Sequence, residues 1–163
     1  MDPIAHILWT YLIYIKDKFW KLALFFSILP DMPLIIFMSY NFLATGIISI
    51  ESNYTFYILQ RSLHSLIIVL PIVLILFLIF KKKVLFLFAW PLHIIVDIFT
   101  HSNYIFKHKP LFPFSDYSFN GINWFNPYFI IVNYILLFVA YYLVYKNVKS
   151  KSNKNNKSIK RRV

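Results

Sequence analysis

The chain has 163 residues, of which 60% are hydrophobic, 21% are aromatic and only 14% are charged, and its formal net charge is +11. Soluble globular domains carry about a quarter charged residues, so this composition excludes an ordinary soluble domain and favours a protein with several membrane-spanning helices. The chain contains no cysteine, which excludes disulfide bonds and thiolate metal sites.

Five hydrophobic segments predict an all-α, polytopic membrane helical bundle. In chain order they are Ile4–Ile15, Trp20–Thr45, Ser62–Phe80, Val84–Phe99 and Pro127–Tyr145. The third and fifth are long enough to cross a bilayer alone, the fourth is shorter, and the first two are either full or partial spans. Pro30 and Pro33 interrupt the second segment. Membrane proteins tolerate such breaks where the helix lines a cavity or a site.

Basic residues set the expected orientation in the membrane. Three groups of them share one side if the spans alternate, namely Lys16 with Lys18 and Lys21, the triplet Lys81–Lys83, and eight basic residues from Lys146 to Arg162. The positive-inside rule makes this side cytoplasmic. We therefore expect an integral membrane domain over residues 1–145 and a basic, disordered cytoplasmic tail over residues 146–163. Anionic lipid is the favoured partner of the tail, and nucleic acid the less favoured one.

The strongest functional signal lies in the fourth segment, within the sequence WPLHIIVDIFTHS. His93, Asp97 and His101 are spaced four residues apart, so a helix places them on one face. A carboxylate inside a membrane segment costs about 2.5–3.5 kcal/mol. A divalent metal held by nitrogen and oxygen ligands would offset that cost. We favour such a metal over hydrogen bonds from these residues to neighbouring helices.

Three further residues extend the candidate ligand set, and each has a simpler alternative. His64 opens the third segment and could instead bond a lipid headgroup. Asp31 lies between two prolines and could instead cap the helix that follows it. His6 lies in the first segment, where a role as an interface anchor has equal weight.

These candidate ligands are expected at one level of the bilayer. Counted at about 1.5 Å per residue from the basic residues of the cytoplasmic side, all of them fall between mid-membrane and the outer interface. Unrelated polar residues would have no reason to share a depth. The sequence therefore predicts one metal site in the outer half of the membrane.

Arg61 precedes His64 by three residues, on roughly the same helical face. An arginine there would hold phosphate oxygens in a bidentate contact, with a role as an outer-interface anchor as the equal alternative. His108 and Asp116 lie in a basic loop, where a solvated side chain is favoured over metal ligation for both and their roles stay open. The aromatic, proline-rich stretch of residues 110–125 favours an aromatic belt at the membrane interface over a lid.

Missing motifs narrow the chemistry. The chain has no HExxH pair, no GxSxG elbow and no Walker or dinucleotide-binding loop. Their absence argues against a zincin protease, a serine hydrolase and a nucleotide-dependent enzyme. On the cytoplasmic side of the candidate ligands, segments such as Leu70–Phe80 contain almost no polar residues, which disfavours an ion pathway.

The order of these motifs resembles the YdjM-like family of bacterial inner-membrane-associated proteins, which are assigned as metal-dependent hydrolases and in some cases are regulated by the LexA repressor. The motifs that carry the likeness are an N-terminal histidine, PDMP at residues 30–33, RSLHS at 61–65, the four-residue spacing of His93, Asp97 and His101, and PLFPFS at 110–115. The family often has His-Arg where this chain has Gln60 and Arg61.

That family is distantly similar to the zinc-dependent phospholipases C and single-strand nucleases, which are all-helical enzymes. The likeness implies one metal position at Asp31, His64, His93 and Asp97, and a second at Asp97, His6 and His101. The soluble enzymes also use the free amine of an N-terminal tryptophan. Because Trp9 is internal here, the resemblance implies that this ligand is lost.

The resulting hypothesis is a membrane-embedded hydrolase of the inner (plasma) membrane, which uses metal-activated water to cleave a phosphoester in a lipid or lipid-linked substrate. One or two Zn²⁺ ions are the expected cofactor. Asp97 is the expected catalytic metal ligand, and Arg61 the expected phosphate-binding group. The alternative is a non-catalytic membrane protein with a structural metal site, which would have a closed coordination shell.

Overall fold

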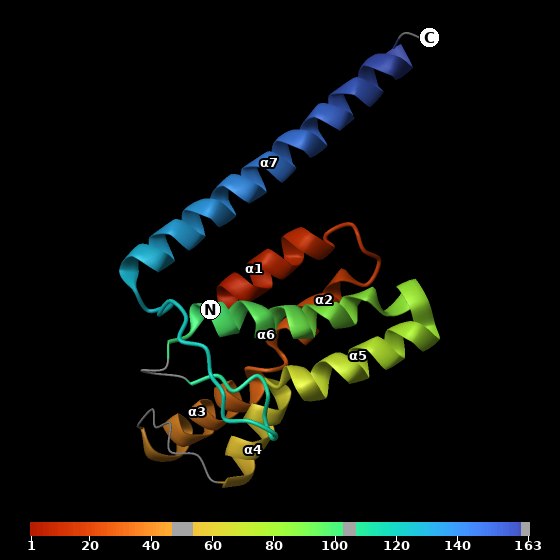
Figure 1. Ribbon diagram of the computed structural model, residues 1–163. Coiled ribbons are helices and arrows are strands. Elements are labelled where there is room, and N and C mark those ends of the chain that lie inside the picture. Colours follow the sequence, from red (N-terminus) through yellow and green to blue (C-terminus); the bar gives the residue numbers. More distant parts are fainter. Residues whose placement is uncertain (47–53, 103–106, 161–163) are drawn as a thin grey trace.

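The computed structural model describes residues 1–46, 54–102 and 107–160, and these residues form helices, turns and loops without any strand (Figure 1). The helices are α1 (Pro3–Tyr14), α2 (Trp20–Ile28), α3 (Met32–Thr45), α4 (Tyr54–Leu63), α5 (Leu66–Phe80), the 3₁₀ helix η1 (Lys81–Phe88), α6 (Ala89–Thr100) and α7 (Pro127–Lys160). The all-α prediction is therefore confirmed for the described residues.

Helix α1 begins where the local chemistry favours a helix start. The Asp2 carboxylate accepts a hydrogen bond from the Ala5 backbone N–H at 2.9 Å, and Pro3 occupies the first turn. The same carboxylate accepts a hydrogen bond from the Tyr134 hydroxyl at 3.0 Å, which ties α1 to the first half of α7. The rest of α7 projects away from the other helices (Figure 1).

The second hydrophobic segment is broken where the prolines predict. Helices α2 and α3 meet at an angle of 62°, and Asp31 lies at the break. In the described chain, the Asp31 side chain makes no capping hydrogen bond to α3. The alternative role of Asp31 as a helix cap is therefore not observed, and its carboxylate, only 15% exposed, faces other side chains.

The third hydrophobic segment, which the sequence predicts as one continuous span, is broken near its start. Helices α4 and α5 are separated by His64 and Ser65 and meet at 55°. Ser65 is extended, and its hydroxyl donates a hydrogen bond to the Phe112 carbonyl at 2.5 Å. The Leu66 N–H donates to the Pro110 carbonyl at 2.9 Å. These bonds hold the loop around residues 110–112 against the break, beside His64.

Helices α5 and α6 form a hairpin that turns through η1 (Figure 1). Lys81 has a positive φ of 54° at the start of this turn. Val69 and Val73 of α5 are fully buried and belong to one apolar cluster with Leu87 and Ile94. The segment over residues 84–99, predicted as one helix, is divided in the structure. It has 3₁₀ geometry as far as Phe88 and becomes an α-helix only at Ala89. The apolar cluster fixes α6, which carries the central candidate ligands.

Two of the basic turns lie side by side in the fold. The turn between α1 and α2 carries Lys16 and Lys18, and the Tyr14 hydroxyl that precedes it donates to the Leu85 carbonyl of η1 at 3.3 Å. The basic residues of these two turns therefore gather at one end of the bundle.

By length and composition, α7 is the one described helix that could cross a membrane by itself, over Pro127–Lys149. The number rises to three if the bent pairs Trp20–Ile28 with Met32–Thr45 and Phe56–Leu63 with Leu66–Thr100 each count as one span. The five predicted segments thus correspond to between one and three candidate spans. Helix α7 continues to Lys160, so most of the predicted disordered tail is helical in the structure.

Candidate metal centre

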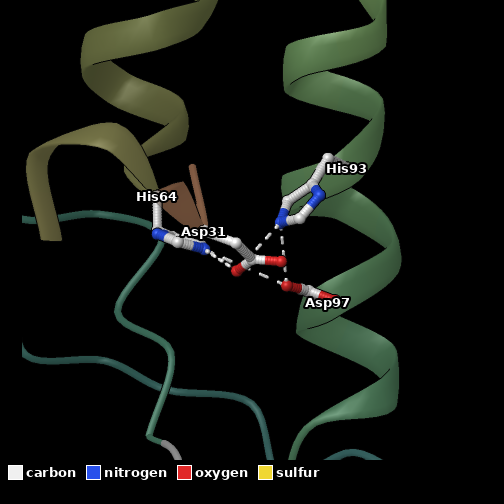
Figure 2. Close-up of side chains that lie close together, drawn as sticks. All are labelled: Asp31, His64, His93 and Asp97. Atoms are coloured by element: carbon white, nitrogen blue, oxygen red, sulfur yellow. Dashed lines mark ion pairs between the residues drawn. The ribbon is translucent and has the colours of Figure 1, made fainter. Parts of the chain in front are cut away.

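Helix α6 supplies the centre of a buried cluster of histidine and aspartate side chains. His93 and Asp97 lie one turn apart on this helix and are 2% and 1% exposed. Asp31 from the α2–α3 break and His64 from the α4–α5 break point toward them (Figure 2). Two residues of the cluster therefore come from one helix face and two from helix breaks.

The side-chain atoms of these four residues converge on one point. His64 Nε2 lies 3.4 Å from Asp31 Oδ1 and 4.0 Å from Asp97 Oδ2. His93 Nε2 lies 3.7 Å from Asp31 Oδ1 and 3.1 Å from Asp97 Oδ2. A tetrahedral zinc shell with bonds of about 2.0–2.2 Å separates its ligand atoms by roughly 3.3–3.6 Å. The cluster, whose ligand atoms all lie within 4.8 Å of one another, could therefore hold a metal ion.

The orientation of the two imidazoles favours metal binding over simple ion pairing. His64 Nδ1 lies 2.9 Å from the Gln60 carbonyl, and His93 Nδ1 lies 2.6 Å from the Ser27 carbonyl. An Nδ1–H that donates to a carbonyl leaves the lone pair on Nε2, which is the usual outer support of a metal-binding histidine. Among the described residues, both Nε2 atoms are buried without a hydrogen-bond partner. Their lone pairs face the two carboxylates, where a cation would fit.

Asp97 also belongs to a second group, with His101 and His108. His101 Nδ1 lies 3.4 Å from Asp97 Oδ1, and His108 Nε2 lies 3.7 Å from Asp97 Oδ2. The two rings contact each other with their centroids 4.3 Å apart. Because both groups include Asp97, this carboxylate is the residue that links them.

The prediction that His108 is a solvated loop residue is wrong. Its side chain is only 12% exposed and lies beside His64, with ring centroids 4.9 Å apart. Burial lowers the pKa of His108 well below that of a free histidine. The imidazole is therefore neutral at physiological pH, which is the form that binds metals.

Asp116, in the same loop, is separate from the cluster. Its side chain is 82% exposed and forms an ion pair with Lys109. The hydrogen bond from Lys109 lowers the pKa of the Asp116 carboxyl. The assignment of Asp116 to a solvated loop agrees with this position.

His6 and the amine of Met1 approach Asp97 from α1. His6 Nε2 lies 2.8 Å from Asp97 Oδ1, and the His6 ring stacks on His93 with centroids 3.8 Å apart. The Met1 amine donates to Asp97 and, at 2.8 Å, to the hydroxyl of Thr100. His6 contacts the shared carboxylate without belonging to either group. The Met1 amine therefore lies beside the carboxylate that both groups share.

Arg61 lies at the wall of a cavity that reaches the cluster. The cavity has a volume of about 560 Å³, and its lining includes Arg61, Asp31, His64, His101 and His108. The Arg61 guanidinium lies 4.2 Å from the centre of the Tyr57 ring. In the part of the chain that the structure describes, its Nε and Nη1 atoms are buried without a hydrogen-bond partner. Arg61 can therefore bind an anion that enters the cavity.

Comparisons with protein-family models, with curated protein sequences and with solved structures find no match to this chain. The likeness to the YdjM-like family stays a prediction that rests on the order of its motifs. The geometry of the cluster stands independently of that likeness, because it is given by the distances and hydrogen bonds between the residues of this chain.

The second group can be tested by substitution of His108. We expect His108→Ala to lower the molar ratio of bound metal to protein, by about half where each group holds one ion. Lys107→Ala is the matched control, because Lys107 is an exposed neighbour on the same loop. Metal analysis of the purified, zinc-loaded variants measures the ratio. Equal metal content in His108→Ala and in the unmodified protein would remove His108 from the ligand set.

Proposed function

We propose that the protein is a metal-dependent hydrolase embedded in the inner membrane, acting on a phosphoester in a lipid or lipid-linked substrate. The observation that carries this proposal is the convergence of His64, His93, Asp31 and Asp97 beside a cavity lined by Arg61, whose Nε and Nη1 atoms have no hydrogen-bond partner among the described residues. Nitrogen and carboxylate ligands without thiolates suit Zn²⁺, so one or two zinc ions are the proposed cofactor.

The opening of the site toward the cavity favours catalysis over a purely structural metal site. Asp31 and His64 of the first group, and His101 and His108 of the second, line the cavity. A catalytic zinc site keeps one position open for water or substrate, whereas a structural site is closed by four protein ligands. A substrate in the cavity would contact the metal-binding side chains directly.

The proposed reaction divides the chemistry between the metal ligands and Arg61. A bound divalent cation supplies Lewis-acid activation of water at neutral pH. The water oxygen bonds to phosphorus as the P–O bond to the leaving alcohol breaks, and a proton from the water passes to the leaving oxygen. Arg61 holds the non-bridging phosphoryl oxygens and stabilises the charge that develops on them. Asp97 would bind the cation and fix the positions of the histidines that contact its carboxylate.

The proposed location follows from the basic turns and the helix composition. The lysine-rich turns would face the cytoplasm with the C-terminus, and the His/Asp cluster would lie in the outer half of the bilayer. At that depth a substrate phosphate at the headgroup level could reach the ligands.

The proposal is tested by hydrolysis assays on the detergent-purified protein. We expect release of phosphate or phosphoalcohol from a set of phospholipids and lipid pyrophosphates when the protein is loaded with Zn²⁺. We expect at least about a 100-fold decrease after metal removal with a chelator, and recovery on readdition. Stoichiometric metal binding without hydrolysis of any phosphoester in the set would instead favour the structural metal site.

A further inference from the structure

The cavity beside the metal-binding cluster has two chemically different ends. Its polar end contains Arg61, Lys107 and Lys109 together with His64, His101 and His108. Its apolar end is lined by Leu34, Ile35 and Met38 of α3 and by Phe56 of α4. A volume of about 560 Å³ is within the usual range for a site that encloses most of a small ligand. A ligand that fills both ends must itself be amphiphilic.

The apolar end is formed by helices that leave large apolar side chains uncovered. Leu34 and Met38 are one turn apart, so they form a continuous strip along α3. Outside the cavity, the same helix exposes Ile36 by 60% and Leu43 by 84%. Helix α3 is also one half of a bent candidate span. Ile35 lines the cavity and is itself 42% exposed, so the apolar lining of the cavity continues onto the outer surface of α3, whose composition suits the bilayer interior.

An aromatic stack joins the two helices of the apolar end. The rings of Phe37 and Phe56 are 4.5 Å apart and nearly parallel. Helices α3 and α4 lie next to each other at the edge of the bundle, on the side away from α7 (Figure 1). A hydrocarbon chain that follows Leu34 and Met38 would leave the cavity along this pair of helices.

We propose that the substrate enters sideways from the bilayer and binds with its phosphate against Arg61 and its hydrocarbon tail along Leu34 and Met38, between α3 and α4. This inference rests on the proposed phosphoester hydrolysis. It adds the route by which the hydrocarbon tail enters and the residues that bind the tail. Charge complementarity supports the head position, because an anionic phosphate meets the cations of the polar end. Apolar complementarity supports the tail position.

Photo-crosslinking tests the tail path without requiring turnover. The probe is an alkyl phosphonate, which cannot be hydrolysed at phosphorus, with a diazirine in the middle of its chain. It is added to the full chain in lipid nanodiscs. We expect the label on residues 34–38 and 56–57, and at least a tenfold loss of that label in the presence of excess unlabelled alkyl phosphonate. Inorganic phosphate and a short-chain phosphonate should compete much less, because they lack the tail.

A labelling pattern spread evenly over lipid-exposed residues of α5 and α7, without competition, would overturn the tail path. Equal competition by the short-chain phosphonate would also overturn it and would indicate a water-soluble substrate. Because the probe is read out by mass spectrometry, this experiment succeeds or fails independently of hydrolysis. Labelling at α3 and α4 combined with no activity would reject the proposed function and retain the lipid site.

A matched pair of substitutions on α3 tests the same path by activity. Met38→Trp places a large side chain in the strip, whereas Ile36→Trp changes an exposed residue that does not line the cavity. We expect Met38→Trp to lower the ratio of long-chain to short-chain phosphoester hydrolysis about tenfold and Ile36→Trp to leave it unchanged. Metal content should equal that of the unmodified protein in both variants. An unchanged ratio in Met38→Trp would overturn the assignment of the strip.

Discussion

Asp97→Asn is expected to abolish metal binding at both groups of the cluster. The Asp97 carboxylate is the one residue common to the two groups, and it is 1% exposed. Its Oδ2 lies 3.1 Å from His93 Nε2, and its Oδ1 lies 2.8 Å from His6 Nε2. An amide has nearly the same shape but no negative charge. Loss of an outer support of a metal site costs 10–100-fold in affinity, so loss of a shared ligand should cost at least about 100-fold.

Zinc titration of the purified variant, followed by metal analysis, measures this effect. Asp116→Asn is the matched control, because it makes the same chemical change at an exposed carboxylate whose partner is Lys109. Asp97→Glu serves as a second variant, because it keeps the charge and displaces it by one methylene. We expect Asp97→Glu to fold and to bind metal more weakly than the unmodified protein. Full zinc content in Asp97→Asn would show that the two groups do not form a metal centre.

The second large effect is expected from substitution of Arg61, which should lower the rate of hydrolysis without changing the metal content. Arg61 belongs to neither metal-binding group, but it lines the cavity that reaches both. Its buried Nε and Nη1 atoms are available for the oxygens of a phosphoryl group. Removal of one preorganised hydrogen-bond donor to a developing oxyanion costs about 10²–10³-fold in kcat. We therefore expect Arg61→Gln to lose about that factor in phosphoester hydrolysis.

Arg61→Lys separates the two contributions of this side chain. Lysine keeps the positive charge but cannot form the planar two-pronged contact that a guanidinium makes with phosphate. We expect its activity to lie between those of Arg61→Gln and the unmodified protein. Steady-state assays on zinc-loaded samples with equal metal content give the comparison. Equal rates in all three proteins would instead favour the alternative role of Arg61 as an outer-interface anchor.

The spacing of residues on one helix made the centre of the cluster predictable. His93 and Asp97 are four residues apart, and that separation places them on one helix face wherever the helix lies in the fold. Asp31 was predictable for a different reason, because the two flanking prolines mark a break in a hydrophobic segment. In both cases, residues close in the sequence determine where the ligand side chain lies.

The contribution of His108 was not predictable from local chemistry. It reaches the cluster because the loop is held at the α4–α5 break, where Ser65 and Leu66 bond to the carbonyls of Phe112 and Pro110. These contacts join residues more than forty positions apart, and no periodic pattern encodes them. The break itself was hidden for a similar reason. From Leu66 to Phe80 the segment is uniformly apolar, and hydropathy alone does not show that the chain bends at the polar residues His64 and Ser65 that precede this run.

The number of membrane spans could be predicted only as an upper limit. Hydropathy identifies apolar segments, but it does not show whether a segment crosses a bilayer or packs inside a bundle. The fourth segment illustrates this limit, because η1 and α6 divide it and α6 has only 12 residues. Some of its apolar side chains pack inside the bundle, and others are exposed on its surface.

The two bends at Asp31 and His64 have a mechanical consequence. Each bend places one ligand between two helical arms, so the angle between the arms fixes the position of the ligand. A cation bound by both Asp31 and His64 would link the α2–α3 bend to the α4–α5 bend. Its bond to His93 would link both bends to α6. Metal binding would therefore restrict the motion of α2, α3, α4 and α5 relative to one another. In the metal-free protein, the angles at the two bends would vary independently.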